Sequence, residues 1–138
     1  MPSIREIQES ILEDFDMYED WLQKYEYLID LGKDLPKLNE KYKTEKNIIK
    51  GCQSRVWLHA EKNKGKVIFS ADSDAIMTKG IIALLIRVFS GQNGSDIANA
   101  NLDFITKIGL KEHLSATRAN GLLSMIKQMK FYALALSK

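Results

Sequence analysis

The 138-residue sequence predicts an α+β fold, in which helices pack on a small, largely antiparallel sheet. Apolar residues recur every three or four positions near both ends of the chain, which is typical of amphipathic helices. A stretch in the middle alternates between apolar and polar side chains, as strands do, and a strongly apolar segment follows it. No internal repeat or linker-like stretch interrupts the chain, so we expect one domain over residues 1–138.

Two helices are predicted before the sheet. Ser3, with Glu6 three residues later, forms the capping-box pattern that begins a helix. The apolar residues of this helix follow helical spacing: Ile4, Ile7, Ile11, Leu12 and Phe15. A second helix is expected from Tyr18 to about Leu31, where Gly32 and then Pro36 stop it. Residues 37–50 are lysine-rich without a clear period, which predicts an irregular connection.

A β-hairpin is predicted next. Residues 54–61 place Val56, Leu58 and Ala60 on one face and Trp57 and His59 on the other. Residues 62–65 (KNKG) predict a turn, and residues 66–71 predict the second strand.

The remaining segments predict helices. Asp72, Ser73 and Asp74 have the composition of a helix N-cap, ahead of a buried helix from Ala75 to Phe89. Residues 90–94 break this helix, and residues 95–108 predict short helical turns. A last helix of about 20 residues is expected to begin near Ser115.

Charge and composition exclude several functions. Residues 1–35 carry ten acidic and three basic residues, whereas residues 36–66 carry nine basic and three acidic ones. This asymmetry is too mild for a nucleic-acid binder and fits either two solvated faces or a protein partner. The N-terminus lacks the features of a signal or transit peptide, and the longest apolar run, residues 80–86, is too short to span a membrane. We therefore expect a cytoplasmic protein without a membrane partner.

The chain has one cysteine, Cys52, and two histidines, His59 and His113. This inventory excludes an internal disulfide, an iron–sulfur cluster scaffold and a good zinc site. No phosphate-binding loop, dinucleotide fingerprint or HExxH motif is present. Cys52 is therefore either a buried structural thiol or a solitary reactive one.

Cys52 lies in a turn between the basic connection and the first strand. Gly51 before it permits a positive φ or a close approach by another group. Gln53 and Ser54 place polar groups beside the thiol. Nearby cations, at Lys46, Lys50 and Arg55, would lower the thiol pKa from its usual value of about 8.5. His59 could serve as a base for Cys52 but is more often a surface or satisfied core histidine.

Residues 51–58, GCQSRVWL, resemble the GCQSxVW signature of the SufE family of sulfur-acceptor proteins. Further segments resemble the family in the same order: LG with LP at residues 31–36, DSDA with KG at residues 72–80, and R-x-x-G at Arg118–Gly121. Two departures occur, because Ala116 stands where the family often has proline and Met77-Thr78 where it usually has β-branched apolar residues.

The resemblance implies the fold shared by SufE and IscU-type proteins, and sulfur transfer in place of enzymatic turnover. Cys52 would accept the persulfide sulfur of a SufS-type, PLP-dependent cysteine desulfurase and pass it to a SufBCD-type cluster scaffold. The chain itself would hold no cofactor and no metal, and it would be a monomer or a homodimer. Gly51 and Gln53 would shape the Cys52 loop, Asp74 would border the contact surface, and Arg118 would orient a partner group.

Several expectations remain open at this point. A regulatory module that binds the desulfurase without carrying sulfur, an acceptor for another sulfuration pathway, and a thiol-dependent enzyme such as a peroxidase are alternatives. Arg118 near a helix N-terminus opposes the helix dipole, which suggests an acidic partner such as Asp72 or Asp74. Because a persulfide needs shielding from solvent, we expect Cys52 to be partly buried.

Overall fold

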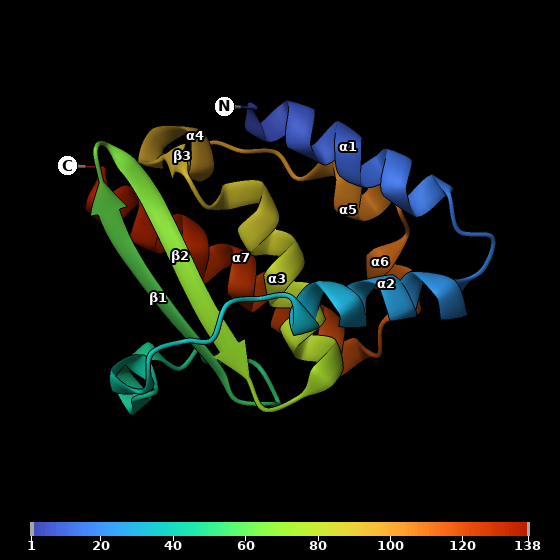
Figure 1. The fold of residues 1–138 in the computed structure, drawn as a ribbon, viewed down its shortest axis with the longest axis horizontal. Helices are drawn as coiled ribbons and strands as arrows, with labels where there is room; N and C mark the ends of the chain where they lie inside the picture. Colours follow the sequence, from blue (N-terminus) through green and yellow to red (C-terminus); the bar gives the residue numbers. More distant parts are fainter. Residues whose placement is uncertain (1, 138) are drawn as a thin grey trace.

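The computed structural model describes residues 2–137, which form helices packed on one three-stranded antiparallel sheet (Figure 1). The elements in chain order are α1 (Ile4–Asp16), α2 (Trp21–Lys33), the 3-10 turns η1 (Glu40–Tyr42) and η2 (Glu45–Asn47), β1 (Val56–Asn63), β2 (Lys66–Ser73), α3 (Ile76–Phe89), β3 (Gln92–Asn93), α4 (Gly94–Ala98), α5 (Asp103–Lys107), α6 (Leu110–His113) and α7 (Ala116–Leu136). The predicted α+β class is confirmed. None of the helices in this range combines the length and the apolar composition that crossing a bilayer needs.

The sheet is built on the predicted hairpin. β1 and β2 pair antiparallel from Val56 opposite Ser73 to Asn63 opposite Lys66. Both strands end two residues later than the sequence predicts. β3 was not predicted, because its two residues are too few to show an alternation; it pairs with the start of β2.

Helix α3 lies at the centre of the core. The apolar face of the hairpin packs against it and contributes the buried side chains Val56, Leu58, Val67, Phe69 and Ala71. On its other side α3 crosses α2, while α7 passes behind the hairpin and α3 in the view of Figure 1. Since α3 is covered on most sides, its sequence is apolar on most sides, as expected.

The sequence predicted that the second helix would stop at Gly32, and this prediction is wrong. Gly32 lies inside α2, which continues to Lys33. The glycine serves a helix crossing: a Cβ on Gly32 would lie 2.8 Å from the Gly80 nitrogen of α3, and a Cβ on Gly80 would lie 2.3 Å from the Leu28 carbonyl oxygen. The two backbones therefore meet directly, which only glycine permits.

The predicted N-cap for α3 is also wrong. Ala75 occupies that position and provides no side-chain cap. The Asp72 carboxylate instead forms ion pairs with Lys43 at 2.9 Å and Lys79 at 3.2 Å, so it ties the basic connection to β2 and α3. Asp74 binds the loop that precedes β1, as described below. The cap predicted at Ser3 is confirmed, because the Ser3 side chain accepts a hydrogen bond from the Glu6 backbone nitrogen. The last helix begins near Ser115 as predicted, and the Ser115 side chain caps it by accepting from the Arg118 backbone nitrogen.

A polar cluster joins the first three helices. The Tyr27 hydroxyl donates to Asp14 Oδ2 at 2.7 Å, and Arg87 Nη1 donates to the same oxygen at 2.9 Å. Burial, together with the hydrogen bond to Asp14, raises the pKa of Tyr27 to about 12. The cluster connects α1 and α2 to the central helix across an otherwise apolar interface.

We expect Gly80→Ala to destabilise the fold by about 3 kcal/mol, because the added methyl group overlaps the Leu28 carbonyl. Alanine gains only about 1 kcal/mol of helix propensity over glycine, which does not offset the overlap. Chemical denaturation measures the change. Glu13→Ala, at an exposed position of α1, is the control and should change stability by less than about 0.5 kcal/mol. Equal midpoints for the two variants would contradict the proposed crossing.

Candidate functional site

The Cys52 loop, defined as residues 50–55, is closed at its base by the start of the sheet. Ile48 forms an isolated antiparallel bridge with Trp57, and the Ile49 backbone nitrogen donates to the Val56 carbonyl at 2.9 Å. Cys52 is therefore in a turn outside the regular elements, where the sequence places it. Both ends of the loop are held while its centre lies free of the ladder.

Asp74 holds the second end of this loop. Its Oδ1 accepts a hydrogen bond from the Arg55 backbone nitrogen at 3.0 Å, and its own nitrogen donates to the Arg55 carbonyl at 3.2 Å. Ser73 Oγ donates to the same carbonyl at 2.8 Å. The connection from β2 to α3 thus binds the residue at which the loop enters β1.

Gly51 has both properties that the sequence suggested, a positive φ and a close approach by another group. Its φ is +92°, in the region that favours glycine. A Cβ on Gly51 would lie 2.4 Å from Ser124 Oγ of α7. The absence of a side chain therefore lets the loop lie directly on α7.

The Cys52 thiol faces the same helix. It is half-buried, and its Sγ–H donates to the Gly121 carbonyl at 3.6 Å. A Cβ on Gly121 would lie 3.4 Å from Sγ, an ordinary van der Waals distance, so the thiol rests against this position without requiring a glycine there. The expected partial burial of Cys52 is confirmed.

The expected direction of the Cys52 pKa is wrong. Burial raises the pKa of the thiol, because the charged thiolate loses hydration. The cations near it in sequence do not reverse this, since Lys46, Lys50 and Arg55 are all exposed to solvent. Donation to the Gly121 carbonyl favours the protonated form as well. In the free protein Cys52 is thus a resting thiol.

A cleft of about 720 Å³ opens beside Cys52. The loop, the start of α3 and the start of α7 supply its lining: Cys52, Gln53, Ser54, Asp74, Ala75, Ile76, Met77, Thr78, Ile81, Ser115, Thr117, Arg118, Gly121 and Met125, with Ile29 of α2. Arg118 contributes the one cation of this lining and Asp74 the one carboxylate. Ile76 lies at the rim, with 67% of its surface exposed.

The structure brings the predicted site residues together. Cys52, Gln53, Asp74 and Arg118 line one cleft, and Gly51 lies behind the loop against Ser124. Arg118 is exposed and forms no ion pair with Asp72 or Asp74 in the described range 2–137, contrary to the suggestion from the helix dipole. The contacts of Gly121 and Ser124 with the loop were not predicted, since a glycine within an apolar helix gives the only signal.

Neither histidine reaches this cleft. The His59 ring stacks on Tyr42 with centroids 3.6 Å apart, and His113 stacks on Trp21 with centroids 3.9 Å apart. His59 is thus not a base for Cys52. Within residues 2–137, no group of three His, Cys, Asp or Glu side chains could hold a metal ion.

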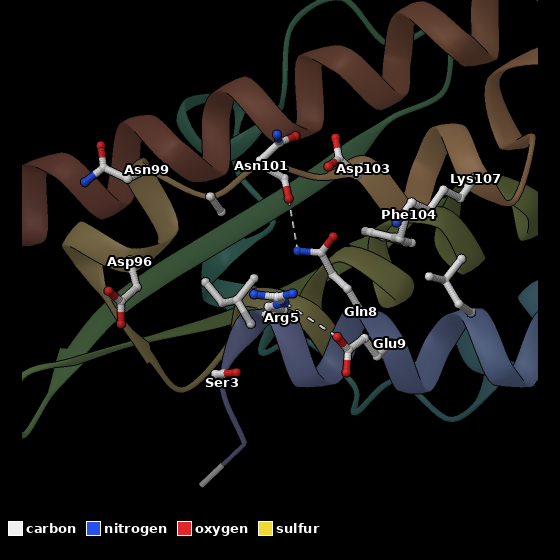
Figure 2. Close-up of a pocket in the computed structure, with 13 residues that line it drawn as sticks. Ser3, Arg5, Gln8, Glu9, Asp96, Asn99, Asn101, Asp103, Phe104 and Lys107 are labelled. Carbon is white, nitrogen blue, oxygen red and sulfur yellow. Dashed lines mark hydrogen bonds and ion pairs between the residues drawn. The ribbon is translucent and has the colours of Figure 1, made fainter.

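A second cleft, of about 610 Å³, lies between α1 and the segment from α4 to α5 (Figure 2). Gln8 Nε2 crosses it to the Asn101 carbonyl at 3.1 Å, and Arg5 pairs with Glu9 at 3.5 Å on α1. Its lining includes neither cysteine nor histidine. We therefore identify the Cys52 cleft as the candidate functional site.

Comparison with known families gives one match across most of the chain. The model of SufE, described as an Fe-S metabolism associated domain, matches residues 9–133. The match includes Cys52 and every residue of its cleft.

Individual relatives agree with this match. A SufE-like protein of Rhizobium meliloti (strain 1021) is 42% identical over 127 residues, which cover 88% of this chain and 91% of that protein. SufE-like protein 1, chloroplastic/mitochondrial, of Arabidopsis thaliana is 43% identical over 117 residues, 82% of this chain but 31% of that protein. The solution structure of a hypothetical protein from Thermus thermophilus shares the fold, with a TM-score of 0.78 and 20% identity over 94% of this chain and 95% of that one.

We expect Gly51→Ala to expose Cys52, because the methyl group meets Ser124 Oγ and pushes the loop from α7. The thiolate is the form that reacts with iodoacetamide, and burial raises its pKa in the native protein. The alkylation rate of Gly51→Ala should therefore rise at lower pH and exceed that of the native protein near neutral pH.

The control is Gly65→Ala in the hairpin turn. Gly65 has a similar φ of +82°, but nothing lies within 4 Å of an added Cβ. The control thus introduces the same backbone strain without contact with α7 and should leave Cys52 alkylation unchanged. Similar alkylation profiles for Gly51→Ala and the native protein would show that the glycine contact does not shield Cys52.

Proposed function

The chain belongs to the SufE family, and we propose from this membership that it accepts sulfur from a PLP-dependent cysteine desulfurase on Cys52 and activates that enzyme. The family's domain is associated with Fe-S metabolism. The observation that carries the proposal is the half-buried Cys52 thiol. It lines one cleft together with the predicted residues Gln53, Asp74 and Arg118.

The transfer step balances without any further reagent. The Cys52 thiolate attacks the terminal sulfur of the desulfurase persulfide, forming a new S–S bond. The S–S bond of the donor breaks, and the desulfurase cysteine leaves as a thiolate that takes up the proton lost by Cys52. Cys52 then carries the persulfide, and attack by an acceptor thiolate on its terminal sulfur repeats the same exchange.

The structure suggests when this step occurs. With its pKa raised by burial, Cys52 is mostly protonated near neutral pH, so the free protein has little thiolate to react with oxidants. Docking of the desulfurase must displace Cys52 from Gly121 before attack. The same half-burial would shield the persulfide after the desulfurase leaves.

The neighbouring residues support distinct parts of this proposal. Gly51 and Gln53 shape the loop, and Asp74 holds its end at Arg55 while bordering the contact surface. The exposed Arg118 guanidinium is free to orient an anionic group of the desulfurase, since it has no ion-pair partner in residues 2–137.

The partners and location follow from the same proposal. The donor is a SufS-type desulfurase, which holds the PLP, and the acceptor is a SufBCD-type scaffold. This chain needs no cofactor of its own for the exchange. We propose a cytoplasmic location because a lone thiol stays reduced there.

Incubation with desulfurase, PLP and cysteine should add the mass of one sulfur atom to the protein. The matched variant Cys52→Ser should gain no sulfur and should not stimulate desulfurase turnover. Intact-mass measurement and sulfide release report the two effects. Stimulation by Cys52→Ser equal to that of the native chain would favour a regulatory module, and peroxide consumption without desulfurase would favour a thiol peroxidase.

Arg118→Gln should slow the loading of Cys52 by about tenfold, the effect of losing about 1.4 kcal/mol of partner binding. Iodoacetamide labelling of Cys52 in the free variant should stay at the native rate, because Arg118 acts on the partner. Lys127→Gln, at an exposed position further along α7, is the control. Native loading by Arg118→Gln would exclude an orienting role.

A further inference from the structure

The solvent-facing side of α7 is unusually apolar. Leu123 is 47% exposed, Phe131 is 61% exposed and Leu134 is 55% exposed. With Lys127 these residues are spaced at i, i+4, i+8 and i+11, so they share one side of the helix, which we name the α7 outer face. The face extends for about 16 Å, or three helical turns. Three large exposed apolar side chains on one face indicate a protein contact.

An apolar groove adjoins this face. It has a volume of about 310 Å³ and lies between α7 and the start of α5. Leu123 belongs to both the groove and the outer face. The other apolar side chains of the groove are Ala100, Leu102, Ile105, Leu122 and Ile126. The face and the groove thus adjoin one another at Leu123.

The charged side chains of this surface are all basic. The α7 sequence, residues 116–136, contains no Asp or Glu, and the groove lining contains none either. Lys127 is exposed in the middle of the outer face, and Lys130 lines the groove, where its Nζ donates to the Ala100 carbonyl at 2.6 Å. A complementary partner segment is apolar in its centre and acidic at its edge.

The same helix forms the wall behind the reactive thiol. Gly121 contacts Cys52, and Ser124 contacts Gly51, while Leu123 between them in sequence turns outward. Arg118, at the start of α7, lines the Cys52 cleft. A protein bound along the outer face would therefore be held beside the Cys52 loop without covering the cleft from which the sulfur donor is expected to approach.

We propose that the α7 outer face docks the protein that receives sulfur from Cys52, through a segment of about three helical turns with an apolar contact side and an acidic edge. This inference rests on the proposed function for the identity of the partner. Separate surfaces for donor and acceptor keep the acceptor near the loaded Cys52 at a high effective concentration.

The test uses the full chain with Phe131→Ser and Leu134→Ser combined, and Lys127→Glu as a separate variant. Each protein is titrated with a SufBCD-type scaffold in its unloaded form, and sulfur transfer from the desulfurase-loaded form is followed by intact mass. We expect the double variant to bind the scaffold at least tenfold more weakly and to transfer sulfur more slowly. Lys127→Glu should also weaken binding and reduce its dependence on salt.

Leu22→Ser is the matched control, since Leu22 is 68% exposed but lies on α2. It should bind, load and transfer as the native protein does, and all variants should load from the desulfurase at the native rate. Binding of the unloaded protein needs no sulfur, so a failure of Cys52 loading would refute the proposed function and leave the docking measurement valid.

Three results would overturn the docking proposal. The first is native scaffold affinity in the double variant. The second is a concentration-dependent dimer of the native chain that the double variant abolishes while scaffold affinity is unchanged. The third is binding to vesicles of phosphatidylserine and phosphatidylcholine that the double variant abolishes, again with native scaffold affinity.

Discussion

The close approach of the Cys52 loop to α7 is the constraint on which the site depends. Gly51 makes it possible, because a Cβ at this position would lie 2.4 Å from Ser124 Oγ, and Cys52 packs against Gly121 on the facing helix. Because Gly51 carries no side chain, the loop lies on the helix and the thiol reaches the Gly121 backbone carbonyl. Packing of the loop on α7 half-buries Cys52, and this burial raises the pKa of its thiol at the edge of the cleft formed with α3.

The rest of the fold holds both partners of this contact. The hairpin and the β2–α3 connection fix the ends of the loop through Ile49 and Asp74. Helix α3, against which the hairpin packs, is in turn located by the direct backbone crossing at Gly32 and Gly80. Two close approaches therefore depend on glycine: the crossing of α2 and α3, and the contact of the Cys52 loop with α7 at Gly51.

The sulfur carrier that we propose must satisfy two opposing demands. Its thiol must become a thiolate to attack a persulfide, yet the persulfide it carries must be kept from solvent. Half-burial meets the second demand and opposes the first, since it raises the pKa of Cys52. A loop fixed at both ends but free of the strand ladder between them reconciles the demands, because a docked partner can move the thiol without unfolding the sheet.

The sequence by itself determined the class of fold, the capping box at Ser3, the hairpin, the long last helix and the motif around Cys52, since each is encoded in neighbouring residues. Tertiary structure decided what depends on residues distant in the chain. Gly32 is predicted from the sequence to stop a helix, but in the structure it allows α2 to cross α3 closely. Asp74 is predicted to cap a helix, but it binds the backbone of Arg55, 19 residues earlier. The cations beside Cys52 in sequence are exposed to solvent, so burial against α7 decides the direction of its pKa shift. This burial exists only in the folded protein, because α7 is distant from Cys52 in the chain.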